Sequence, residues 1–134
     1  VGLALAAERV VELMSEVKYP YNINVATMAI VEKLLREPID DKVVEIKQQR
    51  ELVQTALQGS AVVKKIYPSD ANFLLVEVVD ADAMYDFLIS RGIIVRNRNR
   101  VKGCEGCLRL TIGKPEENEA LLKSISEYEK SVVR

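Results

Sequence analysis

Hydrophobic side chains in the first third of the chain recur every three or four residues, a spacing typical of amphipathic helices. The spacing predicts helices over residues 6–17, 25–36 and 39–57. Pro20 ends the first of them, because proline disfavours helical backbone at the residue before it. Asp40 and Asp41 favour the start of the third helix, where carboxylates oppose the positive end of the helix dipole. We therefore expect an N-terminal helical arm over residues 1–36.

From residue 61 onward the pattern changes to short apolar runs separated by turn residues. These runs predict strands over 62–66, 73–79, 93–95 and 108–112, with helices over 81–90 and from 115 onward. Glu77 is the single charge within the second strand and indicates that one face of that strand is less buried. The order β-β-α-β-β-α predicts an α+β fold, a two-layer α/β sandwich with a mostly antiparallel sheet, over residues 37–134.

Composition narrows the function classes that this fold could serve. The 134 residues are 49% hydrophobic and 29% charged with a net charge of -1, which gives no general case for nucleic acid or membrane as partner. No run approaches the length of a membrane span, and no basic leader opens the chain. A start at Val1 without methionine predicts that the sequence is part of a longer protein. Two cysteines without a signal sequence favour a reducing cytoplasm.

Two arginines flank the polar loop in the segment 92–113, GIIVRNRNRVKGCEGCLRLTIG. Arg96 ends the predicted strand 93–95, and Arg109 lies at the start of the strand 108–112. A charged guanidinium in an apolar strand must be paired or kept near solvent, and its planar fork suits carboxylate or phosphate. Either arginine alone could simply bond a local acid. Two arginines that converge from adjacent strands favour an anion-binding site.

Other polar clusters have simpler explanations. Cys104 and Cys107 have the spacing of a redox pair or half a zinc site, but the chain has no second pair and no histidine. The basic run could meet a nucleic-acid backbone, yet aromatic residues are only 5% of the chain, so a solvated loop is the better interpretation. Helix capping explains the acids near residue 81 without catalysis. The basic run comprises Arg96, Arg98, Arg100 and Lys102, and the acids are Asp80, Asp82 and Asp86.

Several motifs together resemble the C-terminal part of histidinol-phosphate aminotransferases, a family of fold-type I pyridoxal-phosphate enzymes. The matching segments are SDANFL at 69–74, GIIVR at 92–96, CLRLTIG at 107–113 and PEEN at 115–118. The connector KYPYN at 18–22 is similar to the segment that leads from the large domain of that family into its small domain. The motifs agree in order and in spacing, including the thirteen-residue step from Arg96 to Arg109.

The resemblance implies roles for both arginines. Arg109 would hold the α-carboxylate of the amino acid substrate, and Arg96 would bind the substrate phosphate. The parent enzyme would transfer an amino group between histidinol phosphate and glutamate on pyridoxal phosphate, as a homodimer. The resemblance places the Schiff-base lysine, the aspartate that pairs with the pyridinium nitrogen and the cofactor phosphate site in the large domain, ahead of Val1. This chain is therefore expected to bind no cofactor and to be inactive alone.

Two other interpretations remain open at this point. Relatives that act on aromatic amino acids share the arginine at the position of Arg109, so the parent could belong to that group. A β-β-α-β-β-α sandwich can also stand alone as a small-molecule-binding or regulatory module, and an RNA-binding domain that uses the basic loop is a third class. The partners expected under the first interpretation are the small-molecule substrate, the missing large domain and a second copy of the chain, without nucleic acid or membrane.

Overall fold

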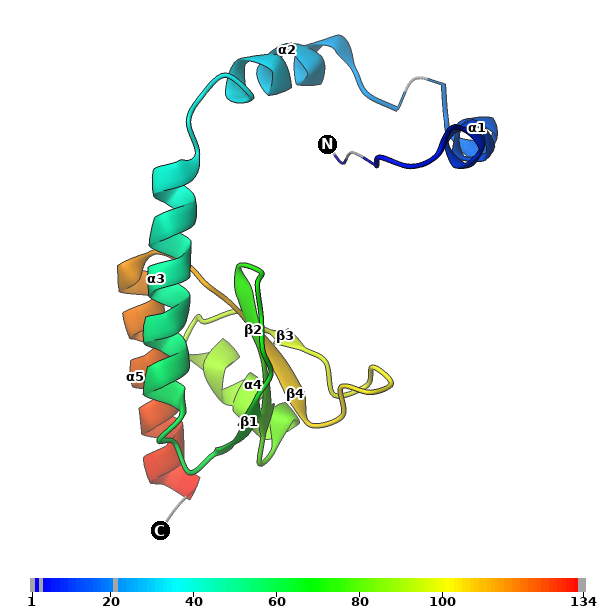
Figure 1. Ribbon diagram of the computed structural model, residues 1–134. Coiled ribbons are helices and arrows are strands. Elements are labelled where there is room, and N and C mark those ends of the chain that lie inside the picture. The colour runs from blue at the N-terminus through cyan, green and yellow to red at the C-terminus, as the bar shows by residue number, and fades with distance from the viewer. Residues whose placement is uncertain (1, 3, 21, 133–134) are drawn as a thin grey trace. The chain divides into compact units, whose positions relative to one another are not determined.

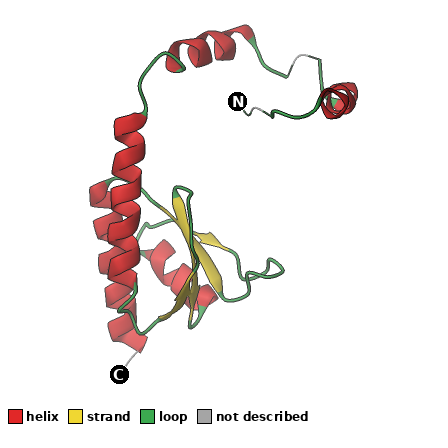
Figure 2. Cartoon of the chain, in the orientation of Figure 1, coloured by secondary structure: helices red, strands yellow, loops and turns green. Residues whose placement is uncertain are grey.

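The computed structural model describes residues 2, 4–20 and 22–132. Contacts divide the chain into two compact units, Val1–Ile39 and Asp40–Arg134. Figures 1 and 2 show the helices and strands of each unit. Within the described residues, no helix is long and apolar enough to cross a membrane.

The first unit contains α1 (Glu8–Val17) and α2 (Val25–Leu34), close to the helices that the hydrophobic spacing predicts. Asn24 caps α2, because its side-chain oxygen accepts a hydrogen bond of 2.8 Å from the backbone N–H of Thr27. Neither helix contains a fully buried residue.

The second unit contains a four-stranded sheet in the order β1-β2-β4-β3, with every neighbouring pair antiparallel. This arrangement confirms the predicted α+β fold. The strands are β1 (Val63–Ile66), β2 (Phe73–Val78), β3 (Arg96–Asn97) and β4 (Cys107–Thr111). The helices are α3 (Asp40–Leu57), α4 (Ala81–Ser90) and α5 (Pro115–Val132).

One face of this sheet forms the core with the three helices. Side chains along β2 alternate between buried and half-buried, as expected when one face of a strand is covered. Leu74 in β2 and Leu108 in β4 are both fully buried. They belong to one cluster with apolar residues of all three helices, including Val53, Leu57, Met84, Leu88, Leu121 and Ile125. The opposite face, which carries Phe73, Leu75 and Glu77 of β2 and Arg109 of β4, is called the open face below.

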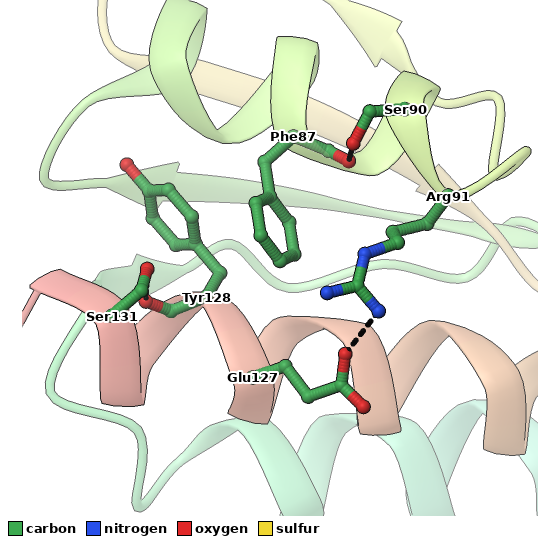
Figure 3. Close-up of polar contacts among 6 residues, drawn as sticks. All are labelled: Phe87, Ser90, Arg91, Glu127, Tyr128 and Ser131. Atoms are coloured by element: carbon green, nitrogen blue, oxygen red, sulfur yellow. Dashed lines mark hydrogen bonds and ion pairs between the residues drawn. The ribbon is translucent and has the colours of Figure 1, made fainter.

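Helices α4 and α5 are joined by an aromatic and ionic contact on the helix side of the sheet (Figure 3). The rings of Phe87 and Tyr128 lie 5.3 Å apart between centroids. The guanidinium carbon of Arg91 lies 5.0 Å from the centroid of the Phe87 ring, and its Nη1 donates a hydrogen bond to Glu127. Arg91 is therefore an arginine whose charge the chain itself neutralises.

The predicted strand over 93–95 is wrong. Only Arg96 and Asn97 pair with β4, so the arginine begins the short strand instead of ending it. The backbone N–H of Ile93 donates to the carbonyl of Leu88 at 2.9 Å, which ties this segment to the end of α4. Gly92, with a φ of 75°, makes the reversal possible. An apolar run that packs beside a helix end has the same sequence pattern as a buried strand.

Candidate functional site

A row of side chains on the open face crosses β3, β4 and β2 and ends at the residue that follows β1. Arg109 in β4 lies opposite Leu75 in β2 on one side and Arg96 in β3 on the other. Tyr67, just after β1, continues the row, because its backbone N–H donates to the carbonyl of Leu75 at 3.0 Å. Directly opposed residues in antiparallel strands point to the same face with their Cβ atoms about 5 Å apart. The structure therefore brings the two predicted arginines together as immediate neighbours.

The guanidinium of Arg109 has an unusual environment. Its carbon lies 4.9 Å from the centroid of the Phe73 ring. Its Nε atom is buried and has no hydrogen-bond partner among the described residues. The ion pairs within residues 2, 4–20 and 22–132 involve Arg9, Arg36 and Arg91, and neither Arg109 nor Arg96. A buried, unpaired donor of this kind costs free energy unless a ligand accepts its hydrogen bonds.

Glu77 is the acid closest to this row along the strands, and it lies on the side away from the Arg109 guanidinium. Glu77 is two residues after Leu75 in β2 and lies opposite Cys107 and Lys65. Phe73 lies two residues before Leu75, so the contact with its ring shows that Arg109 extends in the opposite direction from Glu77. The described residues therefore supply an aromatic surface for this cation but no counter-ion. That arrangement leaves the N–H groups of Arg109 available to an external anion.

Asp82 holds the basic loop that follows β3. The side chains of Asn97 and Asn99 donate to its two carboxylate oxygens at 2.6 and 2.9 Å. Asn99 also accepts a hydrogen bond of 2.8 Å from the backbone N–H of Gly106 at the other end of the loop. The two amide donors, with that from Asn97 the stronger, hold the pKa of the Asp82 carboxyl below its ordinary value.

The sequence interpretation of this aspartate was incomplete. Asp80 is the residue that caps α4, since it accepts a hydrogen bond of 3.0 Å from the backbone N–H of Ala83. Asp82 bridges instead to residues fifteen and seventeen positions further on, according to its hydrogen bonds. No local pattern reports a contact over that distance. The contact exists because β3 packs beside α4 in the folded chain.

The two cysteines belong to a tight turn that leads into β4. The backbone N–H of Cys107 donates to the carbonyl of Cys104 at 3.0 Å, and Gly106 adopts a φ of 72°. Cys107 is buried, and burial raises the pKa of its thiol above the ordinary value. No group of three potential metal ligands occurs in the part of the chain that the structure describes. A raised pKa is the opposite of what activates a thiol, so the geometry gives Cys107 no support as a nucleophile.

Sequence patterns match a known family over nearly the whole chain. The pattern of aminotransferase class I and II matches residues 1–125. A histidinol-phosphate aminotransferase from Parabacteroides distasonis is 44% identical over 126 residues, which cover 92% of this chain and 36% of that protein. The histidinol-phosphate aminotransferase of Christiangramia forsetii is 40% identical over 130 residues, or 96% of this chain and 37% of that protein. The chain thus spans little more than a third of these relatives.

Solved structures share the fold. The histidinol-phosphate aminotransferase of Clostridium acetobutylicum superposes with a TM-score of 0.84 at 20% identity, covering 92% of this chain and 39% of that chain. L-threonine-O-3-phosphate decarboxylase from Porphyromonas gingivalis superposes with a TM-score of 0.75 at 17% identity, over 94% of this chain and 40% of that chain. These identities establish the fold alone. Together with the sequence match over residues 1–125, they show that the chain belongs to the aminotransferase class I and II family.

Proposed function

We propose that this chain is the substrate-anion-binding part of an aminotransferase that transfers an amino group between histidinol phosphate and 2-oxoglutarate or glutamate. The observation that carries the proposal is Arg109, a partly buried guanidinium on the open face without a counter-ion among the described residues. The names of the relatives from P. distasonis and C. forsetii support the substrate. Under this proposal, residues 1–36 form the end of the large domain and the connector into the small domain, which spans residues 37–134.

The two arginines divide the recognition of the substrate anion between them. Arg109 would hold the α-carboxylate, because a guanidinium can donate two parallel hydrogen bonds that define the position and the plane of a carboxylate. Arg96 is exposed beside it and would reach the phosphate, a larger and more solvated anion. Their direct opposition across β3 and β4 supports a site in which both charges act on one substrate.

We propose that this chain does not hold the cofactor of this family by itself. Aminotransferases of class I and II use pyridoxal phosphate, which stabilises the carbanion formed at the substrate α-carbon. Such a cofactor needs an enclosed lysine, but Lys65 on the open face is exposed and stacks on Tyr67, with 4.5 Å from its nitrogen to the ring centroid. We propose that the large domain supplies the cofactor site and that the active assembly is a homodimer.

The cofactor assignment can be tested on the chain alone. After incubation with pyridoxal phosphate and dialysis, we expect no remaining cofactor absorbance and no transamination. A stoichiometric absorbance band that survives dialysis and supports amino-group transfer would contradict the assignment. This test is independent of Arg96 and Arg109, because it depends on the Schiff-base lysine expected in the large domain and not on the anion site.

The role of Arg109 is tested in the complete enzyme by Arg109→Lys, which keeps the charge and loses the two-point contact. We expect the specificity constant to fall with every amino acid substrate, glutamate included, by roughly 2–4 kcal/mol in transition-state free energy. Arg91→Lys is the matched control, because Arg91 also lies over a phenylalanine but bonds Glu127 within the chain. Near-normal kinetics for Arg109→Lys would contradict the carboxylate role.

The role of Arg96 is tested by Arg96→Ala with histidinol phosphate and with unphosphorylated histidinol. If Arg96 binds the phosphate, the substitution penalises histidinol phosphate far more than histidinol, because only the former presents that anion. Equal losses for the two substrates would remove the phosphate assignment. Arg98→Ala is the control, since Arg98 follows on the same loop and lies outside the row that contains Arg109.

A further inference from the structure

Phe73 contacts the guanidinium of Arg109, and packing on the strand alone does not explain this contact. It is the first residue of β2 and lies opposite Thr111 in β4, two positions from the Leu75–Arg109 pair. Its side chain is half-buried on the open face, whereas the core residues of β2 lie on the other face. The Arg109 guanidinium lies over its ring at 4.9 Å.

The contact with Phe73 orders an arginine that no acid of the described chain holds in place. Arginine has a long side chain with many rotamers, and ordering it for a ligand costs conformational entropy. Acids of the chain order other arginines, as Glu127 does for Arg91. For Arg109 an acid would neutralise the charge that the substrate must meet. An aromatic face attracts and orients the cation without using its N–H donors.

We propose that Phe73 is a positioning residue for Arg109. Its ring would restrict the guanidinium to the orientation that receives a substrate carboxylate, and it would cover one side of that guanidinium from solvent. The inference rests on the proposed function of Arg109 for its effect on substrate binding. The stacking itself is a property of the chain and can be measured separately.

The geometry also predicts which replacements keep the role. Tyrosine at position 73 retains the aromatic face, whereas leucine retains apolar bulk and loses the ring quadrupole. A residue that acted only by packing on the strand would tolerate leucine about as well as tyrosine. The comparison of Phe73→Tyr with Phe73→Leu therefore separates positioning from packing.

The first test measures the contact in the 134-residue chain by NMR. The protons on Cδ and Nε of Arg109 should show upfield ring-current shifts that persist in Phe73→Tyr and disappear in Phe73→Leu. Arg91, which lies over Phe87, supplies an internal control whose shifts should not change. Unchanged Arg109 shifts in a folded Phe73→Leu chain would overturn the stacking and with it the proposal.

The second test measures the consequence in the complete enzyme. Phe73→Leu should lower the specificity constant for glutamate by about threefold to thirtyfold, mainly through KM, and Phe73→Tyr should restore it. In an Arg109→Lys background, Phe73→Leu should cause a smaller further loss, because both changes act on one contact.

The outcomes of the two proposals are distinguishable. If Arg109→Lys is nearly normal, the carboxylate role fails while the ring-current shifts still report the stacking. If Arg109→Lys loses activity but Phe73→Leu and Phe73→Tyr behave alike, the anion site stands and the positioning role of Phe73 is overturned. Equal losses from Phe73→Leu in the wild-type and Arg109→Lys backgrounds would also overturn it.

Discussion

Two regions of the second unit each place an arginine over a phenylalanine, and the two differ in what surrounds the charge. Between α4 and α5, Arg91 lies 5.0 Å from the Phe87 ring and donates to Glu127. On the open face, Arg109 lies 4.9 Å from the Phe73 ring and has no acid partner among the described residues. The aromatic contact is nearly the same in distance, and the counter-ion is present in one region only.

Under the proposed function, the difference separates a stabilising arginine, Arg91, from an anion-binding arginine, Arg109. An ion pair supplied by the chain joins two helices, and its charges are largely satisfied before any ligand arrives. An arginine that stacks without an acid keeps its donors free, and the chain tolerates this cost because the opposite face of the sheet supplies the core. Under the proposed function, one face of the sheet supplies the core and the open face binds the substrate anion.

The largest predicted effect is a difference in the free energy of unfolding between substitutions at two adjacent residues of β4. Leu108 is fully buried on the core face, so Leu108→Ala should lower the free energy of unfolding by about 2–5 kcal/mol. Arg109→Met should leave the free energy of unfolding unchanged or raise it by up to about 1 kcal/mol, because a buried donor without a partner is removed. Urea denaturation measures both values. A loss from Arg109→Met as large as that from Leu108→Ala would show that the arginine is structural.

A second prediction concerns the cysteines beside the open face. Cys107 is buried with a raised pKa, whereas Cys104 is partly exposed, so iodoacetamide at pH 8 should modify Cys104 at least about tenfold faster. Mass spectrometry of the partly alkylated chain measures the ratio. Replacing both residues with serine should leave the fold intact and zinc content at background. Stoichiometric zinc in the purified chain, lost in the double variant, would show that the pair binds metal.

A smaller effect is expected for the stabilising arginine. Arg91→Met removes an ion pair and a cation–π contact that are both near the surface, so the free energy of unfolding should fall by about 0.5–1.5 kcal/mol. High salt should reduce the difference between wild type and variant, because it screens the pair with Glu127. Equal changes in the free energy of unfolding for Arg91→Met and Arg109→Met would contradict the claim that Arg91 stabilises the fold and Arg109 does not.

The smallest effect concerns the acid that holds the basic loop. Because hydrogen bonds from Asn97 and Asn99 hold the pKa of Asp82 below its ordinary value, the carboxylate stabilises the loop above the unfolded pKa of about 3.9. That contribution is lost as the pH falls through the lower, folded value. The NMR shift of the Gly106 amide should therefore change below about pH 4 in the wild type. In Asp82→Asn this change should be absent. The same pH profile in the wild type and in Asp82→Asn would show that Asp82 does not hold the loop.

Much of the fold could be predicted from sequence because its elements have strong local signals. Periodicity located α1 to α5, and the single charge of Glu77 correctly indicated the less buried face of β2. The order of strands and helices then left few arrangements for the sheet. The segment 93–95 was misplaced because its apolar residues pack against the end of α4, and periodicity does not distinguish this from strand pairing.

The candidate site could be predicted only in part for a similar reason. Arg96 and Arg109 were recognisable because a charge in an apolar run is unusual, and the register confirms that they are neighbours. The contact of Phe73 with Arg109 depends on strand register and side-chain direction, neither of which the sequence states. The same holds for Asp82, whose partners become neighbours only when β3 returns beside α4.

The most direct test of this account is a titration of the 134-residue chain with acetate, a simple carboxylate, at constant ionic strength. Heteronuclear NMR would follow the Nε–H groups of Arg109 and Arg91 in the same sample. The account predicts a saturable shift at Arg109, which has no counter-ion in the described chain, and none at Arg91, which Glu127 already pairs. The Arg109 response should disappear at high salt. No shift at Arg109, or equal shifts at both arginines, would contradict the central claim that the open face is built to bind an anion.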